Sequence, residues 1–414
     1  MNRREFITGA LGAGAACALL GCGRRGSGRL ALTYNTYWTG LDAHTKAMDW
    51  VYAEYRRKYP HIDLQVTQVA GGAQDNGQKL MAELSAGGGP DILHDTGWDQ
   101  VGGGYLLDLT EHISSWKDRF YKEALDNCAW NGKIYNLPTE FSYVPCLWNM
   151  RVLDSVGKGV PSTWEEYIDL GHALKAKHIP LTSLYVYGIF VFNAIVFGHQ
   201  GASDLIRGKH WRSEPLLEAM KAMEHMIRAG FVPSNDMELQ FPNAISQFRD
   251  GQLAHYIGGA WTLANDITMV GVDPKLRDDV AFAPIPAYNG HRPMQAWIAT
   301  KSGLNQNLRN HPDKLNAALD FYKIFTSPKS AVNFVSLAHS PQGVKVNVTE
   351  EMAGPLLYRF IKSHEQATNI FVPPNNPPTF EKNGWTAIAD AVACMLEGGS
   401  AEKALDVYAT DLEM

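Results

Sequence analysis

Residues 30–93 read LALTYNTYWTGLDAHTKAMDWVYAEYRRKYPHIDLQVTQVAGGAQDNGQKLMAELSAGGGPDIL. Apolar residues alternate with period two in some parts of this stretch and recur at helical spacing in others, so the pattern switches repeatedly between strand and helix. Strand, helix, strand, helix and strand within about 65 residues predict a parallel sheet wound with helices. The expected elements are strands at 30–34, 62–67 and 91–93, and helices at 41–58 and 79–84.

The rest of the chain predicts a second body. A chain of 414 residues exceeds the ~250–300 residues at which a single core stops growing. Asn131-Gly132 predicts a hairpin turn, and 143–148 is an extended apolar stretch that can cross to a second lobe. Thr163 and Glu166 have the spacing of a capping box, after which helices dominate.

The N-terminal segment carries two export signals. Arg3 and Arg4 precede a large apolar residue, as in twin-arginine signals, and Leu19-Leu20-Gly21-Cys22 resembles a bacterial lipobox. The apolar run between them is too short for the ~20 residues that span a bilayer, although a buried helix with a chance arginine pair is the alternative. We expect 1–21 to be a signal peptide, Cys22 to carry a lipid anchor and 22–28 to be a tether. The mature protein then works in the periplasm or on the outer face of the cell membrane.

Charge and cysteine content exclude several classes of protein. The net charge of −6 disfavours nucleic-acid binding, which needs a basic surface. Cys128, Cys146 and Cys394 form neither a disulfide framework nor a metal-ligand spacing, so buried free thiols are expected. The 11 Trp, 17 Tyr and 16 Phe are numerous, and many stand beside Gly, Pro or Asn rather than in periodic runs, which suggests aromatic rings at a ligand surface.

Short motifs follow one another along most of the chain. They are GPDI at 89–92, LLDLT at 106–110, GKIYNLP at 132–138, PSTWEE at 161–166, FRDGQLA at 248–254, GAW at 259–261 and LEGGSAEKAL at 396–405. Each motif is weak alone, but their order, from about residue 30 to the C-terminus, resembles that of bacterial extracellular solute-binding proteins of the carbohydrate-importer type. The sequence departs from the usual family pattern over 338–343.

The resemblance implies two α/β lobes joined by hinge strands, with ligand trapped in the cleft when the lobes close. It implies lobe one at 29–144 and 292–340, and lobe two at 145–291 and 341–414. It also implies that the closed form is presented to the membrane permease of an ABC importer, whose ATPase is cytoplasmic. We expect a monomer, no cofactor and a sugar ligand.

A sugar site needs aromatic faces for C–H surfaces and planar polar groups for hydroxyls. In lobe one, Trp38 follows the first strand, and its alternative role is core packing. Asp95 and Trp98 follow the third strand, and Asp75 lies at a helix start after two glycines. Both carboxylates have helix capping as an alternative role.

Further candidates lie at the hinge and in lobe two. Glu140 and Tyr143 flank the presumed crossing. Tyr187 precedes Gly188 within an apolar run, where core packing is at least as favoured. Trp261 follows Gly258-Gly259, which allow close approach of a ligand, although a core role is again the alternative. Gln295 and Trp297 lie on a strand that the family places near the cleft, and alternation puts both on one face.

No GxSxG, HExxH or P-loop motif occurs, and the histidines have no metal-ligand spacing. A lipid-anchored carbohydrate-active enzyme is the main alternative function, because sequence cannot show whether two carboxylates flank a glycosidic bond. Binding of an amino acid, peptide or metal is a third, less favoured alternative.

Overall fold

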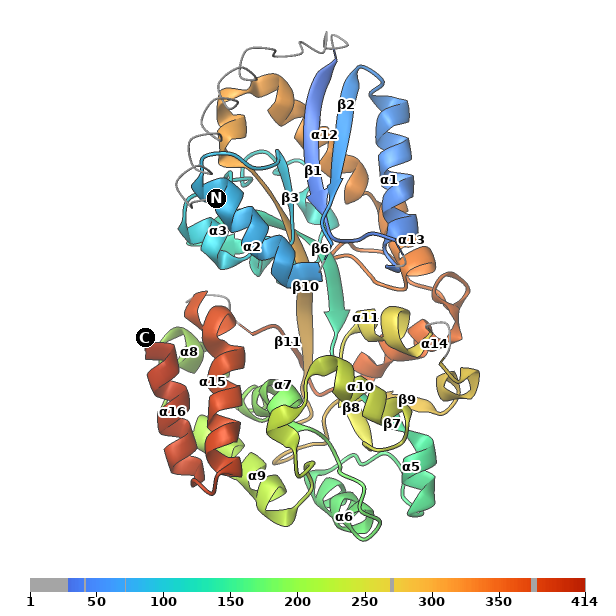
Figure 1. Ribbon diagram of the computed structural model, residues 1–414, viewed down its shortest axis with the longest axis vertical. Helices are drawn as coiled ribbons and strands as arrows, with labels where there is room; N and C mark the ends of the chain where they lie inside the picture. The colour runs from blue at the N-terminus through green and yellow to red at the C-terminus, as the bar shows by residue number, and fades with distance from the viewer. Residues whose placement is uncertain (1–28, 41, 71, 269–271, 374–377, 414) are drawn as a thin grey trace, which may run out of the picture.

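The computed structural model describes residues 29–40, 42–70, 72–268, 272–373 and 378–413. It consists of two lobes arranged along the long axis of the molecule (Figure 1). The proposed signal peptide, Cys22 and the tether lie outside the described residues. Within these ranges, no helix has the length and apolar character needed to cross a membrane.

The first lobe is built on a mixed sheet, which confirms the predicted α/β class. Its strands lie side by side in the order β11-β10-β3-β1-β2, and β6 pairs with β10. β1 runs parallel to β2 and β3, whereas β10 is antiparallel to β3 and β6. The strands are β1 (Leu30–Thr36), β2 (Ile62–Gln68), β3 (Ile92–His94), β6 (Asn136–Tyr143), β10 (Met294–Leu304) and β11 (Ile370–Phe371).

Helices cover this sheet. In α1 the buried residues recur at helical spacing, and this face packs against α12, α13 and the sheet. The helix begins at Thr45 rather than at the expected residue 41. The helices of this lobe are α1 (Thr45–Lys58), α2 (Gly72–Ser85), α3 (Trp98–Gly102), α4 (Lys122–Asp126), α12 (Pro312–Phe325) and α13 (Pro328–Ala338).

The predicted hairpin is present between β4 (Ala129–Trp130) and β5 (Lys133–Ile134). Asn131 and Gly132 both have positive φ, 50° and 75°, as a type I′ turn requires. The cysteine prediction is confirmed for Cys128 and Cys146, which are buried free thiols, whereas the free Cys394 is only partly buried.

The second lobe has a smaller sheet, in which β7 (Cys146–Asn149) lies between β8 (His255–Ile257) and β9 (Val280–Ala283), antiparallel to both. Most of its mass is helical (Figure 1). Its helices are α5 (Met150–Ser155), α6 (Trp164–Lys175), α7 (Leu184–Val196), α8 (Ala202–Arg207), α9 (Glu214–Ala229), α10 (Phe241–Arg249), α11 (Ala260–Thr262), α14 (Glu350–Lys362), α15 (Pro378–Leu396) and α16 (Ala401–Glu413).

The central helix of this lobe is α7, which is apolar on every side and is packed by α9 and α15. Gly188 permits the close approach of α15, because a Cβ there would lie 3.3 Å from side-chain carbons of Ile388 and Val392. The capping box predicted at α6 is confirmed, since the Thr163 hydroxyl accepts from the Glu166 amide and the Glu166 carboxylate accepts from the Thr163 amide.

Long strands connect the lobes. β6 and β10 are paired from Asn136↔Gly303 to Tyr143↔Ala296 and run together down the middle of the molecule (Figure 1). β10 starts beside β11 near the second lobe and ends beside β3 in the first. The pairing register shifts on either side of Thr300. The segment between α13 and α14 is a third connection, and the residue boundaries expected for the lobes stay a prediction.

Candidate functional site

The carboxyl ends of β1 and β3 point toward the second lobe, so the loops that follow them face the space between the lobes (Figure 1). The start of α2 lies at the same level. In wound α/β sheets this edge is where ligands bind, because the loops there diverge and leave a crevice.

A pocket of about 480 Å³ lies at this edge, beside the paired hinge strands. Three segments line it: α2, the loop from β3 into α3, and β10. Its polar lining combines carboxylates, amides and an amine with one indole ring. These side chains are Gln78, Asp95, Asp99, Gln100, Lys301 and Trp297.

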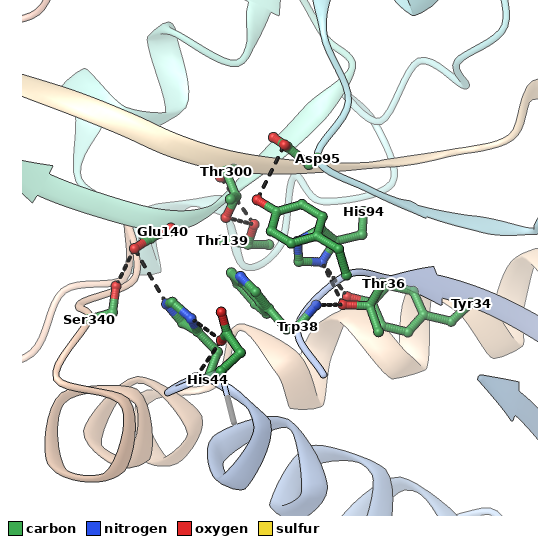
Figure 2. Close-up of polar contacts among 12 residues, drawn as sticks. Tyr34, Thr36, Trp38, His44, His94, Asp95, Thr139, Glu140, Thr300 and Ser340 are labelled. Carbon is green, nitrogen blue, oxygen red and sulfur yellow. Dashed lines mark hydrogen bonds and ion pairs between the residues drawn. The ribbon is translucent and has the colours of Figure 1, made fainter. Parts of the chain in front are cut away.

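Asp95 lines this pocket, in agreement with its expected position after the third strand. It does not cap α3: the N-cap is Gly97, and the Gln100 side chain accepts from the Gly97 amide at 2.7 Å. Its φ of 57° lies in the left-handed region, which Asp tolerates better than most residues. The Tyr37 hydroxyl donates to Asp95 Oδ2 at 3.3 Å (Figure 2). One side of the carboxylate is thereby oriented by the β1 loop.

Lys301 is a pocket residue that the sequence reasoning missed. The strand β10 carries it into the pocket lining, and its Nζ lies 5.0 Å from the centre of the Trp98 ring. Trp98 itself is buried and packs edge-on against Trp130. The ring of Trp98 therefore contacts the Lys301 ammonium, and the role of Trp98 as a ligand platform stays a prediction.

Trp38 packs in the core, which was its alternative role. The side chain is only 3 % exposed and belongs to the core of the first lobe. It is stacked on His44, with ring centroids 4.2 Å apart, and meets His94 edge-on at the same distance (Figure 2). Phe334 is a third neighbour, with ring centroids 5.7 Å apart. These contacts fit the core alternative for Trp38, and its contact with a ligand stays a prediction.

Glu140 is buried, and its carboxylate has protein partners, so its expected ligand role stays a prediction. The Ser340 hydroxyl donates to Oε1 at 2.5 Å, and His44 Nε2 lies 3.4 Å from the same oxygen (Figure 2). The other ring nitrogen of His44 is 2.8 Å from Asp42. Burial alone would lower the pKa of His44, but the two carboxylates outweigh it and raise the pKa to about 9. The histidine is thus a buried cation at neutral pH.

The remaining hinge candidate, Tyr143, lies elsewhere. Its ring stacks on His364, with centroids 4.5 Å apart, and lines a separate cavity of about 310 Å³ between β6, the segment after α13, and α14. Neither ring is among the residues that line the 480 Å³ pocket. The structure therefore does not bring Tyr143 together with Asp95.

Two further candidates, Tyr187 and Gln295, are buried. Tyr187 is fully enclosed in α7 against Tyr256, so the core alternative describes it correctly. Gln295 accepts from Asn193 Nδ2 at 3.1 Å and is 5 % exposed. Trp297 lines the pocket, whereas Gln295, two positions earlier on the same strand, contacts Asn193 of α7.

Three further candidates retain accessible surface, in addition to Asp95 and Tyr143. Trp297 is partly exposed and lines the pocket. Trp261 is also partly exposed and lies on α11. The backbone amide of Ala260, the first residue of this helix, donates to Ser142 Oγ at 2.8 Å. A Cβ at position 259 would lie 2.1 Å from the Trp261 ring, so glycine is required there. Asp75 is exposed in the first turn of α2, between lining residues of the pocket.

Trp385 is a second residue that the sequence reasoning missed. It is partly exposed on α15 and meets Trp297 edge-on, with ring centroids 6.4 Å apart and an interplanar angle of 85°. The sequence contains a sign of this residue, because Gly384 precedes Trp385 just as Gly97 precedes the candidate Trp98. Trp385 was overlooked because it lies in a predicted terminal helix. Among the described residues, no group of three or more His, Cys, Asp or Glu side chains could hold a metal ion.

Comparisons with known proteins agree with this architecture. The diacetylchitobiose-binding protein NgcE of Streptomyces coelicolor is 24 % identical over 327 residues, which cover 72 % of this chain and 68 % of that protein. The multiple sugar-binding protein of Streptococcus mutans is 22 % identical over 156 residues, 36 % of this chain and 34 % of the relative.

Solved structures show the same fold. A chitin oligosaccharide binding protein superposes with a TM-score of 0.76 at 19 % identity, covering 93 % of this chain and 98 % of the other. Maltose-bound MalE3 of T. maritima gives 0.72 at 16 % identity, with coverage of 93 % and 99 %. The sequence model of one family matches residues 50–341, well over half of the chain. The chain therefore belongs to the family of bacterial extracellular solute-binding proteins.

Proposed function

We propose that this protein binds a sugar, as a monosaccharide, an oligosaccharide or a derivative, and delivers it to the membrane subunits of an ABC importer. The observation that carries the proposal is the 480 Å³ pocket at the hinge, which combines Trp297 with Asp95, Asp99 and Lys301. The family acts outside the cytoplasm, where such capture takes place.

The chemistry of the pocket suits a sugar ring. A pyranose exposes C–H surface on its faces and hydroxyls around its edge. An indole ring can cover the C–H faces. Carboxylates and amides can accept hydrogen bonds from the hydroxyls, and an ammonium group can donate to the hydroxyl oxygens. The relatives named above are binding proteins for sugars rather than enzymes. They support binding without turnover and do not support the enzyme alternative.

Replacing Trp297 by alanine should weaken sugar binding by about 2 kcal/mol, or roughly 30-fold, because the indole is the only aromatic ring among the residues that line this pocket. The ligand is first found by thermal shift with a carbohydrate panel, since a ligand at about 100 times its Kd raises the unfolding free energy by about 2.7 kcal/mol. Affinity is then measured by calorimetry.

The matched control is Trp50→Ala, which removes a partly exposed indole on α1 that contacts Lys329 in the first lobe. Its affinity should equal that of the wild type. A panel in which no carbohydrate stabilises the protein would refute the proposed function, and an unchanged affinity in Trp297→Ala would move the site away from this pocket.

We also propose that the protein is exported by the twin-arginine route, cleaved after residue 21 and held at the membrane by lipid on Cys22. The support is the order of signals in residues 2–22. Cys22→Ser should move the protein from the membrane fraction to the soluble fraction without changing its unfolding midpoint, because 22–28 is proposed to be only a tether. Cys394→Ser is the control and should stay on membranes. Retention of Cys22→Ser on membranes would exclude the anchor.

We further propose a monomer whose lobes, with the boundaries given above, close on the ligand.

A further inference from the structure

A series of aromatic rings extends from the pocket across the second lobe. It begins at Trp297, continues to Trp385 at 6.4 Å, and reaches Phe241 at a further 5.7 Å between ring centroids. Each neighbour meets the next edge-on, with interplanar angles of 85° and 61°. The rings come from β10, α15 and α10, which are far apart in sequence, so the series exists only in the folded protein. We call these residues the aromatic series.

The aromatic series is held in place by buried rings beneath it. Phe190 meets Trp385 at 5.2 Å and Tyr187 meets Phe241 at 5.7 Å, and both supporting side chains lie in α7. Phe190 and Tyr187 are almost completely buried. The outer rings are therefore fixed before any ligand arrives, and little side-chain entropy is lost when a ligand covers them.

The outer end of the series is unusually exposed. Phe241 is 42 % exposed, and only four large hydrophobic residues in the described part of the chain reach such exposure. A second of the four, Met237, lies on the short turn that precedes α10. Apolar surface left in water at the rim of a binding site marks an area that a ligand covers.

The position of the series relates it to the cleft. The start of α15 lies at the end of the second lobe that faces the first lobe (Figure 1), and α15 carries Trp385. Trp297 belongs both to the pocket lining and to the series. A ligand held in the pocket can thus continue from Trp297 to Trp385 and on to Phe241.

We propose that the ligand is an oligosaccharide, with one unit in the pocket at Trp297 and further units over Trp385 and Phe241. This inference rests on the proposed function and adds chain length to it. A linear oligosaccharide repeats an apolar face at intervals of about one ring, and the separations along the series are of that size. A monosaccharide would fill the pocket and leave Phe241 in water. Phe241 is therefore the residue that sets the preference for longer chains.

The test measures affinity against chain length. Chito-, xylo- and malto-oligosaccharides are titrated by calorimetry from the monosaccharide to the hexasaccharide, with wild-type protein and with Phe241→Ala. For the series that binds, the wild-type affinity should rise with each unit until the aromatic series is covered. Phe241→Ala should lose about tenfold for the longer chains and keep the wild-type affinity for the shortest chain that binds.

Leu337→Ala is the control, because Leu337 is 44 % exposed on α13 in the first lobe. Its affinities should match the wild type at every length, and the unfolding midpoints of both variants establish that they are folded. An affinity independent of chain length, or an equal loss at every length in Phe241→Ala, would overturn the inference while leaving sugar binding intact.

Two other outcomes separate the alternatives. If no carbohydrate binds at any length, the proposed function fails and this inference fails with it. If Phe241→Ala binds every oligosaccharide normally but associates more weakly with the importer in proteoliposomes, the series docks to the membrane subunits instead.

Discussion

Replacing Glu140 by alanine is expected to lower the free energy of unfolding by about 3–5 kcal/mol, because it leaves the buried His44 cation without its main partner. The side chains of His44 and Glu140 are 2 % and 4 % exposed, so water cannot replace the lost carboxylate. Ser340 loses its acceptor as well. The loss is measured as the difference in unfolding free energy from urea denaturation at neutral pH.

Two variants calibrate this result. Glu140→Gln keeps an oxygen for the Ser340 hydroxyl but removes the charge, so its loss should be smaller than that of Glu140→Ala. Asp126→Ala breaks an exposed ion pair with Lys122 and should cost much less than Glu140→Ala, because water screens both charges. An equally small cost for Glu140→Ala would show that the network is unimportant to stability.

The same network has a signature in pH. The pKa of His44 is raised to about 9 in the folded protein, above the ~6.5 of an unfolded chain. Its contribution is therefore fully present below pH ~6.5 and is lost as the pH rises through about 9. Removing Glu140 should flatten this part of the stability curve.

Replacing Trp38 by alanine is expected to cost about 3–5 kcal/mol of unfolding free energy, the usual loss for a large aromatic residue in a core. The indole fills the space between His44, His94 and Phe334. Its removal leaves a cavity that these rings, fixed on separate elements, cannot close. Unfolding is followed without ligand, so that binding does not contribute.

Trp50→Ala is again the control, since this partly exposed indole should cost much less. The opposite pattern, with the unfolding midpoint of Trp38→Ala unchanged and its sugar affinity strongly reduced, would return Trp38 to the binding site. The comparison therefore distinguishes a role of Trp38 in ligand binding from a role in core packing.

Local features of the fold follow from the sequence because their causes are local. The Asn131-Gly132 turn and the Thr163–Glu166 capping box depend on residues at most three positions apart, and both are present. The positive φ of Gly230 ends α9 for the same reason. Chain length predicts two lobes, but the way the strands connect them depends on pairings such as Asn136↔Gly303, which no local pattern indicates.

The candidate site was only partly predictable. Asp95 was predicted from its position after the third strand, and Trp297 from a strand that the family places near the cleft; both line the pocket. The burial of the aromatic candidates Trp38, Trp98 and Tyr187 could not be predicted, because it depends on partners that are distant in the sequence. Trp38 is covered by His94 and Phe334, and neither contact is visible in the sequence around residue 38. Lys301 was overlooked because a lysine in a strand is usually a surface residue, whereas this one is buried and lines the pocket.

The paired hinge strands limit how the lobes can move. Because β6 and β10 remain hydrogen-bonded to each other across the crossing, they form one ribbon, and sliding one strand past the other would break the ladder. A ribbon bends easily only about an axis in its plane, and the register shifts around Thr300 weaken it locally beside Lys301. We therefore expect this joint to act as a flexure with one soft direction. The lobes then do not search many relative orientations, and the entropy lost on closing around a ligand is correspondingly small.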